Sequence, residues 1–244
     1  MIDLHTHILP HVDDGARDLT ESLAMAKMAV ADGLTHLFAT PHHRDYTTLS
    51  RQEVAERVAQ LQAELDKAGI PLILLPGHEV RLYNDVFNDW DNHIAGPLGS
   101  SRYVLAEPLF SHYDKQTDAM LFELFARGYT PIMAHPERIR PLQDNLTLIE
   151  PFLAAGGLTQ ITATSLTSNS DWRAKKTAET MLRNGMAHII ASDAHHPYHR
   201  PPTLTAARDV AAAIVGQEQA QAMVTTRPLA VVKNEPIVIA PVFI

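Results

Sequence analysis

Histidines and acidic residues gather in short segments of this chain, at spacings that indicate metal chemistry. The chain opens with "MIDLHTHILPHVDDG", in which His5 and His7 are two positions apart and two aspartates follow. Later segments read "ATPHHR", "LLPGHEV", "VLAEP", "IMAHPER" and "IIASDAHH". Because side chains two apart on an extended strand point the same way, His5 with His7, and Asp193 with His195, can each reach into one pocket.

Imidazole and carboxylate ligands without thiolates suit divalent ions such as Mn, Fe or Zn. The chain has 14 histidines and no cysteine, which excludes thiolate sites, disulfides and cysteine nucleophiles. The side chains are too numerous for one ion, so we expect two or three ions, with a glutamate able to bridge two of them. Water bound between such ions drops from a pKa of about 15.7 to about 7. The resulting cationic pocket suits a phosphate ester that arginines also hold.

The elements that must position these residues alternate between short apolar runs and amphipathic stretches. The expected strands are 2–5, 35–40, 71–75, 103–106, 130–134, 158–163 and 187–191. The expected helices are 19–32, 51–67, 117–127, 146–155, 172–184, 204–215 and 218–224. The apolar, proline-containing segment after Arg227 is expected to pack along an edge.

Seven strand-to-helix units without a break in composition predict one α/β domain, residues 1–244, built on a parallel sheet. The regular rhythm and the length favour a barrel, and an open doubly wound sheet is the alternative. Nearly every histidine or acidic cluster falls at the carboxyl end of an expected strand. In a parallel barrel these ends meet on one face, where active sites lie.

The charge and composition of the chain limit the kinds of binding partner and the cellular locations that we expect. The 244-residue chain has a formal charge of −8, which argues against nucleic acid as a partner. We expect no signal peptide and no membrane insertion, because a basic-then-apolar leader and a long apolar run are both missing from the sequence. The lack of cysteine is compatible with a cytoplasmic location.

Taken together, these motifs resemble the PHP superfamily, and within it the manganese-dependent bacterial protein-tyrosine phosphatases of the CpsB and YwqE type. The shared motifs are "DLHTHI", "VDDG", "ATPHH", "GHE", "AEP", "AHPER", "SDAHH" and "RPP", which occur in this order between residues 3 and 202. The resemblance implies a distorted (β/α)7 TIM-like barrel with a centre of three metal ions.

The resemblance also implies the site residues. The ligands of the first ion would be His5, His7, Glu79 and Asp193. Glu79 would bridge to a second ion completed by Glu107 and His135. The third ion would take Asp14, His42 and His195. Arg138 and Arg200 occupy positions that resemble phosphate clamps and are the expected catalytic arginines.

At three places two adjacent residues of the same type occur, and either one could be the metal ligand. Either histidine of the "PHH" pair, and either of the "DAHH" pair, could be the ligand, with His42 and His195 preferred. Asp14 is preferred over Asp13, which can serve the turn before Gly15. A histidine also precedes Glu79 where the resemblance leads us to expect a small residue.

The resemblance implies a phosphotyrosine substrate on a tyrosine autokinase that controls capsule or exopolysaccharide synthesis. Its tail would lie as an extended peptide over the barrel mouth. We expect a metal-bridging hydroxide to attack phosphorus directly, without a phosphoenzyme. Tyrosine, with a pKa of about 10, is a tolerable leaving group, and a rim histidine such as His43 or His196 is a candidate general acid.

Three other functions are compatible with parts of the pattern. One is a PHP phosphoesterase for a small metabolite such as histidinol phosphate, or for a nucleotide. Another is an inactive module that binds a partner kinase, which the complete ligand set argues against. The third is an amidohydrolase, which usually needs a lysine ligand after a middle strand, and the sequence offers none at such a place.

Overall fold

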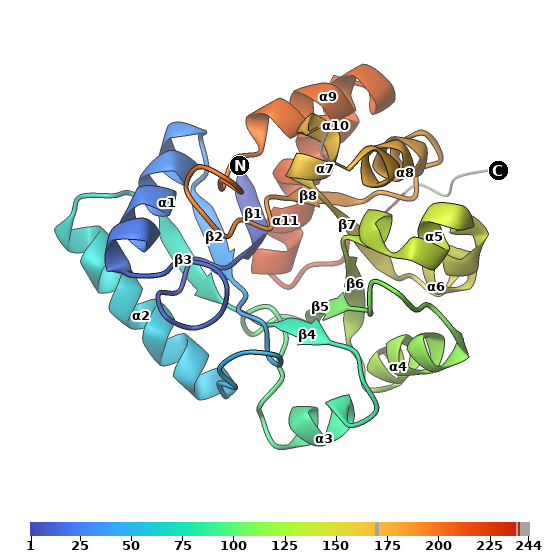
Figure 1. Cartoon of the computed structure of the whole chain (residues 1–244), viewed down its shortest axis with the longest axis horizontal. Coiled ribbons are helices and arrows are strands. Elements are labelled where there is room, and N and C mark those ends of the chain that lie inside the picture. Colours follow the sequence, from blue (N-terminus) through green and yellow to red (C-terminus); the bar gives the residue numbers. More distant parts are fainter. Residues whose placement is uncertain (169–170, 238, 240–244) are drawn as a thin grey trace.

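The computed structural model describes residues 1–168, 171–237 and 239. Strands lie at the centre of the molecule and helices surround them (Figure 1). The strands are β1 (Ile2–Thr6), β2 (His36–Ala39), β3 (Ile73–Pro76), β4 (Glu79–Arg81), β5 (Tyr103–Glu107), β6 (Thr130–Ala134), β7 (Leu158–Thr162) and β8 (Ile189–Ala191). All the pairings between these strands are parallel, as the alternation of strands and helices predicts.

The strands form two parallel sheets. One has the order β1-β2-β3, and the other has the order β4-β5-β6-β7-β8. Isolated parallel bridges adjoin the two sheets at both edges, Thr6 with Ala194 and His42 with Glu79. Thr6 ends β1, His42 and Ala194 follow β2 and β8, and Glu79 begins β4 shortly after β3, so that the segments rich in histidine and acid meet there.

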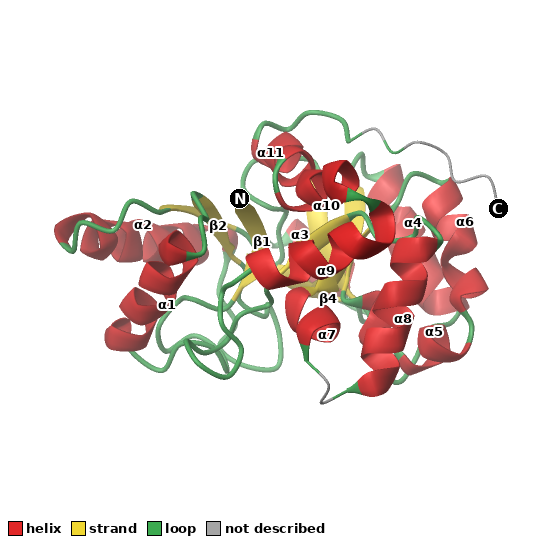
Figure 2. Ribbon diagram, turned by 90° about the horizontal axis from the view of Figure 1, so that it is seen from above, coloured by secondary structure: helices red, strands yellow, loops and turns green. Residues whose placement is uncertain are grey.

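The helices lie outside the sheets. They are α1 (Leu19–Ala31), α2 (Arg51–Lys67), α3 (Val86–Asp91), α4 (Lys115–Ala126), α5 (Arg140–Asp144), α6 (Glu150–Ala154), α7 (Ala163–Thr167), α8 (Trp172–Arg183), α9 (Thr205–Val215), α10 (Gln217–Val224) and α11 (Thr226–Val232), with 3-10 turns η1 (Pro136–Arg138) and η2 (Leu146–Ile149). Figure 2 shows α1 and α2 at one end of the molecule and α4, α5, α6 and α8 at the other.

Local sequence explains where the longest helix begins and which face it buries. The side chain of Ser50 accepts from the Glu53 backbone, and Glu53 accepts in return, which forms a capping box at the start of α2. The buried residues of α2 recur at spacings of three and four: Val54, Val58, Leu61 and Leu65. This apolar stripe packs into the main hydrophobic cluster, as expected of an amphipathic helix.

The structure differs from the sequence-based expectation in several elements. The short helices α3, α5 and α7 were not expected. The segment that was expected to run on from the third strand contains a separate short strand, β4. The expected helix over 146–155 is split into η2 and α6, because Pro151 lacks the amide hydrogen that a continuous helix needs. The segment after Arg227 was expected to lie along an edge, but its start belongs to α11, whose first turn accommodates Pro228.

Beyond α11 the chain does pack against the sheets. The backbone amide of Ile237 donates to the hydroxyl of Tyr103 over 3.1 Å. Ile237 and Ile239 contact the hydrophobic cluster beneath β1 and β5. Residues 238 and 240–244 of the expected edge segment lie outside the described residues.

None of the helices within the described ranges is both long and apolar enough to cross a lipid bilayer.

Candidate metal centre

The nine side chains predicted as metal ligands converge at the carboxyl ends of the strands. They form four overlapping groups, and within each group the candidate ligand atoms lie within 4.8 Å of one another. The groups are His7, Asp14, His42 and His195; His5, His7 and Asp193; His5, Glu79 and His135; and His42, Glu79 and Glu107. Because four residues occur in two groups each, the groups form one continuous cluster.

Two members of the cluster hold an unusual backbone conformation. His135, directly after β6, has a φ of 33°, and Asp193, shortly after β8, has a φ of 52°. A residue with a side chain rarely adopts this left-handed region, and such strain tends to occur at functional sites. The Asp193 amide donates to the carbonyl of His5 over 2.9 Å, which holds the strained residue against β1.

The loop after β1 folds back so that Asp13 supports His7. The Nδ1 atom of His7 lies 2.7 Å from Oδ2 of Asp13, which also accepts from the His42 amide, while Oδ1 of Asp13 accepts from the Gly15 amide. A Cβ atom at Gly15 would lie 2.0 Å from the His7 carbonyl oxygen, so only glycine fits this turn. Asp13 therefore orients a candidate ligand, while Asp14 is the aspartate within the cluster.

Hydrogen bonds behind the rings direct histidine lone pairs into the cluster. The Nδ1 atom of His5 donates to the side-chain oxygen of Gln160 over 2.9 Å, and His7 donates from Nδ1 to Asp13. The Nδ1 atom of His195 donates to the carbonyl of Asp193 over 2.9 Å. In each ring this leaves the Nε2 lone pair free, which is the arrangement that metal-binding histidines commonly show.

The inner face of the cluster fits divalent cations. The Nε2 atoms of His5 and His7 lie 3.2 Å apart, which brings two acceptor lone pairs together. The Oε2 atoms of Glu79 and Glu107 are buried and receive no well-aligned hydrogen bond within the described residues, although His42 Nδ1 lies 2.8 Å from the first and Arg81 Nη2 lies 3.1 Å from the second. Buried carboxylates are costly without a donor or a cation. Metal ions would satisfy both kinds of atom, so the donor set fits the predicted metals.

The electrostatics of the cluster also favour added positive charge. Burial lowers the pKa of the His7 imidazole, but the adjacent Asp13 carboxylate outweighs it and raises the pKa to about 10. Burial likewise lowers the pKa of His42, yet contacts with Asp14 and Glu79 raise it to about 11. The pKa of Glu107 rises to about 8 through burial and the charge of Glu79. Carboxylates packed this closely need cations beside them.

Arg138 and Arg200 meet on one oxygen of Asp193. The Nη1 atom of Arg138 lies 2.7 Å from Oδ2 of Asp193, and Nη2 of Arg200 contacts the same oxygen. Both arginines line a cavity of about 220 Å³ together with members of the cluster. Because Asp193 engages one end of each guanidinium, the other donors remain available to an anion in the cavity.

Arg81 is a cation at the cavity that sequence reasoning missed. It lies two positions after Glu79 on β4, and its Nη2 atom is 3.1 Å from Glu107 and 3.0 Å from Asp45. The two-residue alternation of a strand could have placed it beside Glu79, had β4 been predicted.

Two exposed aromatic rings stand at the entrance and were also missed. Tyr46 is 48% exposed and stacks on His42 with ring centroids 5.3 Å apart. Phe110 is 42% exposed, and its ring centroid lies 5.2 Å from that of His135. Both rings line the cavity. They lie in loops after β2 and β5, and no spacing pattern in the sequence distinguishes them.

The neighbouring histidines of the doubled pairs lie outside the cluster. His43 is fully buried, its Nε2 atom is 3.3 Å from Asp89, and burial lowers its pKa to about 4. The expectation that His43 stands at the rim is therefore wrong. The ring of His196 accepts instead from the amide of Tyr198 over 3.0 Å.

The other histidine that raised a question, the one before Glu79, is also buried. His78 donates from Nε2 to the carbonyl of Leu49 over 3.2 Å, away from the candidate ligands.

A comparison with known protein families decides the family. The family model described as "Capsular polysaccharide synthesis, CpsB/CapC" matches residues 1–233. The chain belongs to the CpsB/CapC family. Among CpsB/CapC relatives, the tyrosine-protein phosphatase YwqE of Bacillus subtilis (strain 168) is 36% identical over 197 residues, covering 80% of this chain and 78% of the relative. The tyrosine-protein phosphatase CpsB of Streptococcus pneumoniae is 27% identical and covers 96% of this chain and 99% of the relative.

Solved structures agree with this CpsB/CapC assignment. A chain described under "Crystal structures of YwqE from Bacillus subtilis and CpsB from Streptococcus pneumoniae, unique metal-dependent tyrosine phosphatases" superposes with a TM-score of 0.93 at 34% identity, covering 99% of this chain and 98% of that chain. A β-aspartyl dipeptidase from Fervidobacterium islandicum AW-1 is 14% identical with a TM-score of 0.56, covering 95% of this chain and 73% of that one. That second likeness concerns the fold alone.

Proposed function

We propose that this protein is a metal-dependent phosphatase that hydrolyses phosphotyrosine in proteins. The observation that carries the proposal is that two arginines, Arg138 and Arg200, line one cavity together with seven members of the continuous cluster of nine candidate metal ligands. Ligands of this kind suit divalent metal ions, and the arginines suit the phosphoryl oxygens of a monoester. The names of the YwqE and CpsB relatives support the same activity.

The ligand sets expected from the sequence are compatible with the geometry. Glu79 shares one group with His5 and His135 and another with His42 and Glu107, which supports a bridging role. Asp14, His42 and His195 lie together in a further group with His7. Divalent ions held by these residues would supply Lewis-acid charge and an activated water.

The remaining side chains at the cavity would bind and orient the substrate. Arg138 and Arg200 would hold the phosphoryl oxygens, each keeping one end of its guanidinium on Asp193. Tyr46 and Phe110 would contact the aryl ring as it enters. Because the chain has no cysteine, it cannot use the thiol nucleophile of other tyrosine phosphatases.

The finer expectations follow from the same proposal. We take manganese as the metal, with iron or zinc as alternatives, and a tyrosine autokinase in the cytoplasm as the partner. The phosphotyrosine tail of that kinase would be the substrate in the control of capsule or exopolysaccharide synthesis. We also propose that residues 1–244 form one phosphatase domain and that the two sheets together make a distorted (β/α)7 barrel, which the bridges at both edges support.

Phosphate release from two substrates tests the activity. A phosphotyrosine peptide and histidinol phosphate are compared after chelator treatment and after re-addition of Mn²⁺. We expect peptide hydrolysis that EDTA abolishes and Mn²⁺ restores. A preference for histidinol phosphate would favour the small-metabolite phosphoesterase, and chelator-resistant hydrolysis would contradict the metal mechanism.

A further inference from the structure

We propose that a groove beside the cavity binds an acidic side chain of the substrate peptide, a few residues from the phosphotyrosine. This inference rests on the proposed phosphatase function and adds a preference for sequence around the reacting residue. The groove has a volume of about 630 Å³ and is called the arginine groove here. Its lining residues are Phe110, Arg138, Arg140, Gln143, Asp171 and Arg173.

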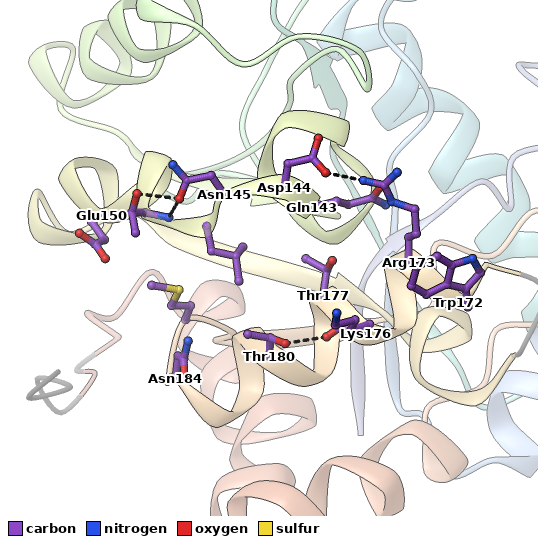
Figure 3. Close-up of a pocket in the computed structure, with 13 residues that line it drawn as sticks. Gln143, Asp144, Asn145, Glu150, Trp172, Arg173, Lys176, Thr177, Thr180 and Asn184 are labelled. Atoms are coloured by element: carbon purple, nitrogen blue, oxygen red, sulfur yellow. Dashed lines mark hydrogen bonds and ion pairs between the residues drawn. The ribbon is translucent and has the colours of Figure 1, made fainter.

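The arginine groove is continuous with the metal cavity. Phe110 and Arg138 line both, so a peptide that leaves the cavity on this side enters the groove directly. On its far side the groove shares Gln143 and Arg173 with an outer pocket between α5 and α8 (Figure 3). Trp172, 68% exposed, lines that outer pocket beside Arg173. An extended peptide therefore has a lined path away from the cavity.

The charge of the arginine groove favours an acidic ligand. Three arginines and one aspartate line it, in a chain whose net charge is −8. The carboxylate of Asp171 is already engaged as the N-cap of α8, where it accepts from the Arg173 and Ala174 amides. Two of the three arginines already form ion pairs, because Arg138 pairs with Asp193 and Arg173 pairs with Asp144.

Arg140 is the cation of the groove whose charge is not already used. Its side chain is exposed, and within residues 1–168, 171–237 and 239 it forms no ion pair. Its backbone amide donates to the carbonyl of Phe110 over 2.8 Å, which fixes the start of α5 against the cavity entrance. Arg140 therefore stands at a fixed position with its charge free for a ligand.

A second groove that adjoins the cavity has the opposite balance of charge. It shares Asp45 and Arg81 with the cavity and is also lined by Arg44, Asp85 and Asp89, so that three aspartates face two arginines. Its two arginines both pair with its aspartates. An acidic side chain would be repelled in this groove and attracted in the arginine groove. The charge difference between the two grooves gives the bound peptide a direction.

Charge reversal at Arg140 tests the inference. The substrates are phosphotyrosine peptides of one length whose flanking positions, on one side or the other, carry glutamate, glutamine, lysine or phosphoserine. The readout is the ratio of kcat/KM between peptides for one enzyme, so that changes in overall activity cancel. Arg183→Glu is the matched control, because Arg183 is an exposed arginine at the end of α8 that pairs with Glu179.

For the wild type we expect glutamate to exceed glutamine by roughly fivefold on one side of the phosphotyrosine, the size of a favourable exposed charge contact. Added salt should reduce the ratio. Arg140→Glu should abolish it and favour the lysine peptide, while Arg183→Glu should leave it unchanged. A larger ratio for phosphoserine than for glutamate would assign the groove to a phosphate rather than a carboxylate.

Two negative outcomes are distinguishable. Equal kcat/KM for the glutamate and glutamine peptides, or an unchanged ratio in Arg140→Glu, would overturn this inference alone. If the metal-loaded wild type hydrolyses no phosphotyrosine peptide, the proposed function fails and takes this inference with it.

Discussion

His135 lies 2.8 Å from Glu79, Nε2 to Oε1, although 56 positions separate the two residues in the chain. His42 approaches the other oxygen of the same carboxylate, with its Nδ1 atom 2.8 Å from Oε2. The two carboxylate oxygens of Glu79 therefore each contact a histidine ring, one from the segment after β6 and the other from the segment after β2. Within the proposed centre this carboxylate is the member on which the others depend most.

Replacing Glu79 with glutamine should remove metal and activity together. Glu79→Gln keeps the shape but loses the charge and one acceptor oxygen. We expect kcat to fall by at least about 100-fold, since loss of even an outer-shell partner typically costs 10- to 100-fold in metal affinity or activity. Elemental analysis of the purified protein measures the metal. Glu123→Gln, at an exposed residue paired with Arg127, is the control. Full metal content with near-normal turnover would exclude Glu79 as a ligand.

Replacing Arg138, one of the two arginines that contact Asp193, should lower the rate of phosphate-ester hydrolysis. Arg138→Ala should lower kcat/KM by about 100-fold, the usual cost of one preorganised donor to developing charge. Arg138→Lys should recover only part of this, because lysine keeps the charge and loses the two-pronged geometry. Steady-state kinetics with p-nitrophenyl phosphate measure both. Arg183→Ala, far along α8, should behave as the wild type. Equal rates for Arg138→Ala and the wild type would remove Arg138 from the phosphate site.

The gathering of the site residues could be predicted because it depends on simple periodicity. His5 lies in β1 and His7 directly after it, two positions apart, and Asp193 follows β8, whose carboxyl end lies beside that of β1. The contact of His5 with Asp193, 3.4 Å from Nε2 to Oδ1, joins those strand ends. Apolar runs marked the strands, and parallel strands bring their ends together.

Features that depend on tertiary packing could not be predicted. The support of His7 by Asp13 requires the tight turn at Gly15, where the nearby carbonyl and Cβ atoms of His7 leave no room for a side chain. The short strand that carries Arg81 has only three residues, too few for a periodic signal. Whether Tyr46 or Phe110 faces the cavity depends on loop paths that no local pattern encodes.

The aromatic rings at the entrance should select aryl phosphates. Tyr46→Ala and Phe110→Ala should each raise KM for p-nitrophenyl phosphate by roughly 2- to 10-fold, the worth of one aromatic contact. The KM of an alkyl phosphate should change less, because it offers no ring to stack. Phe122→Ala, at a 39% exposed ring of α4, is the control. An unchanged KM for the aryl substrate in both variants would show that the rings do not contact it.

Buried His188 should make stability fall in mild acid. Its Nδ1 atom accepts from the amide of Thr159 over 3.0 Å, so the folded protein holds the ring neutral. Burial, aided by the charge of Arg227, lowers its pKa from 6.5 to about 4. Because the folded pKa lies below the unfolded one, the stabilisation is complete above pH 6.5 and is lost as the pH falls toward about 4, a change of about 3 kcal/mol at most.

A variant that cannot titrate isolates this contribution. His188→Asn keeps an acceptor near the Thr159 amide, so we expect its melting temperature to fall less than that of the wild type between pH 6.5 and 4. The other acid-sensitive groups, including the candidate ligands, are common to both proteins and cancel in the difference. His112→Asn, at an exposed residue, should follow the wild type. Parallel melting profiles for wild type and His188→Asn across this range would mean that His188 does not couple folding to pH.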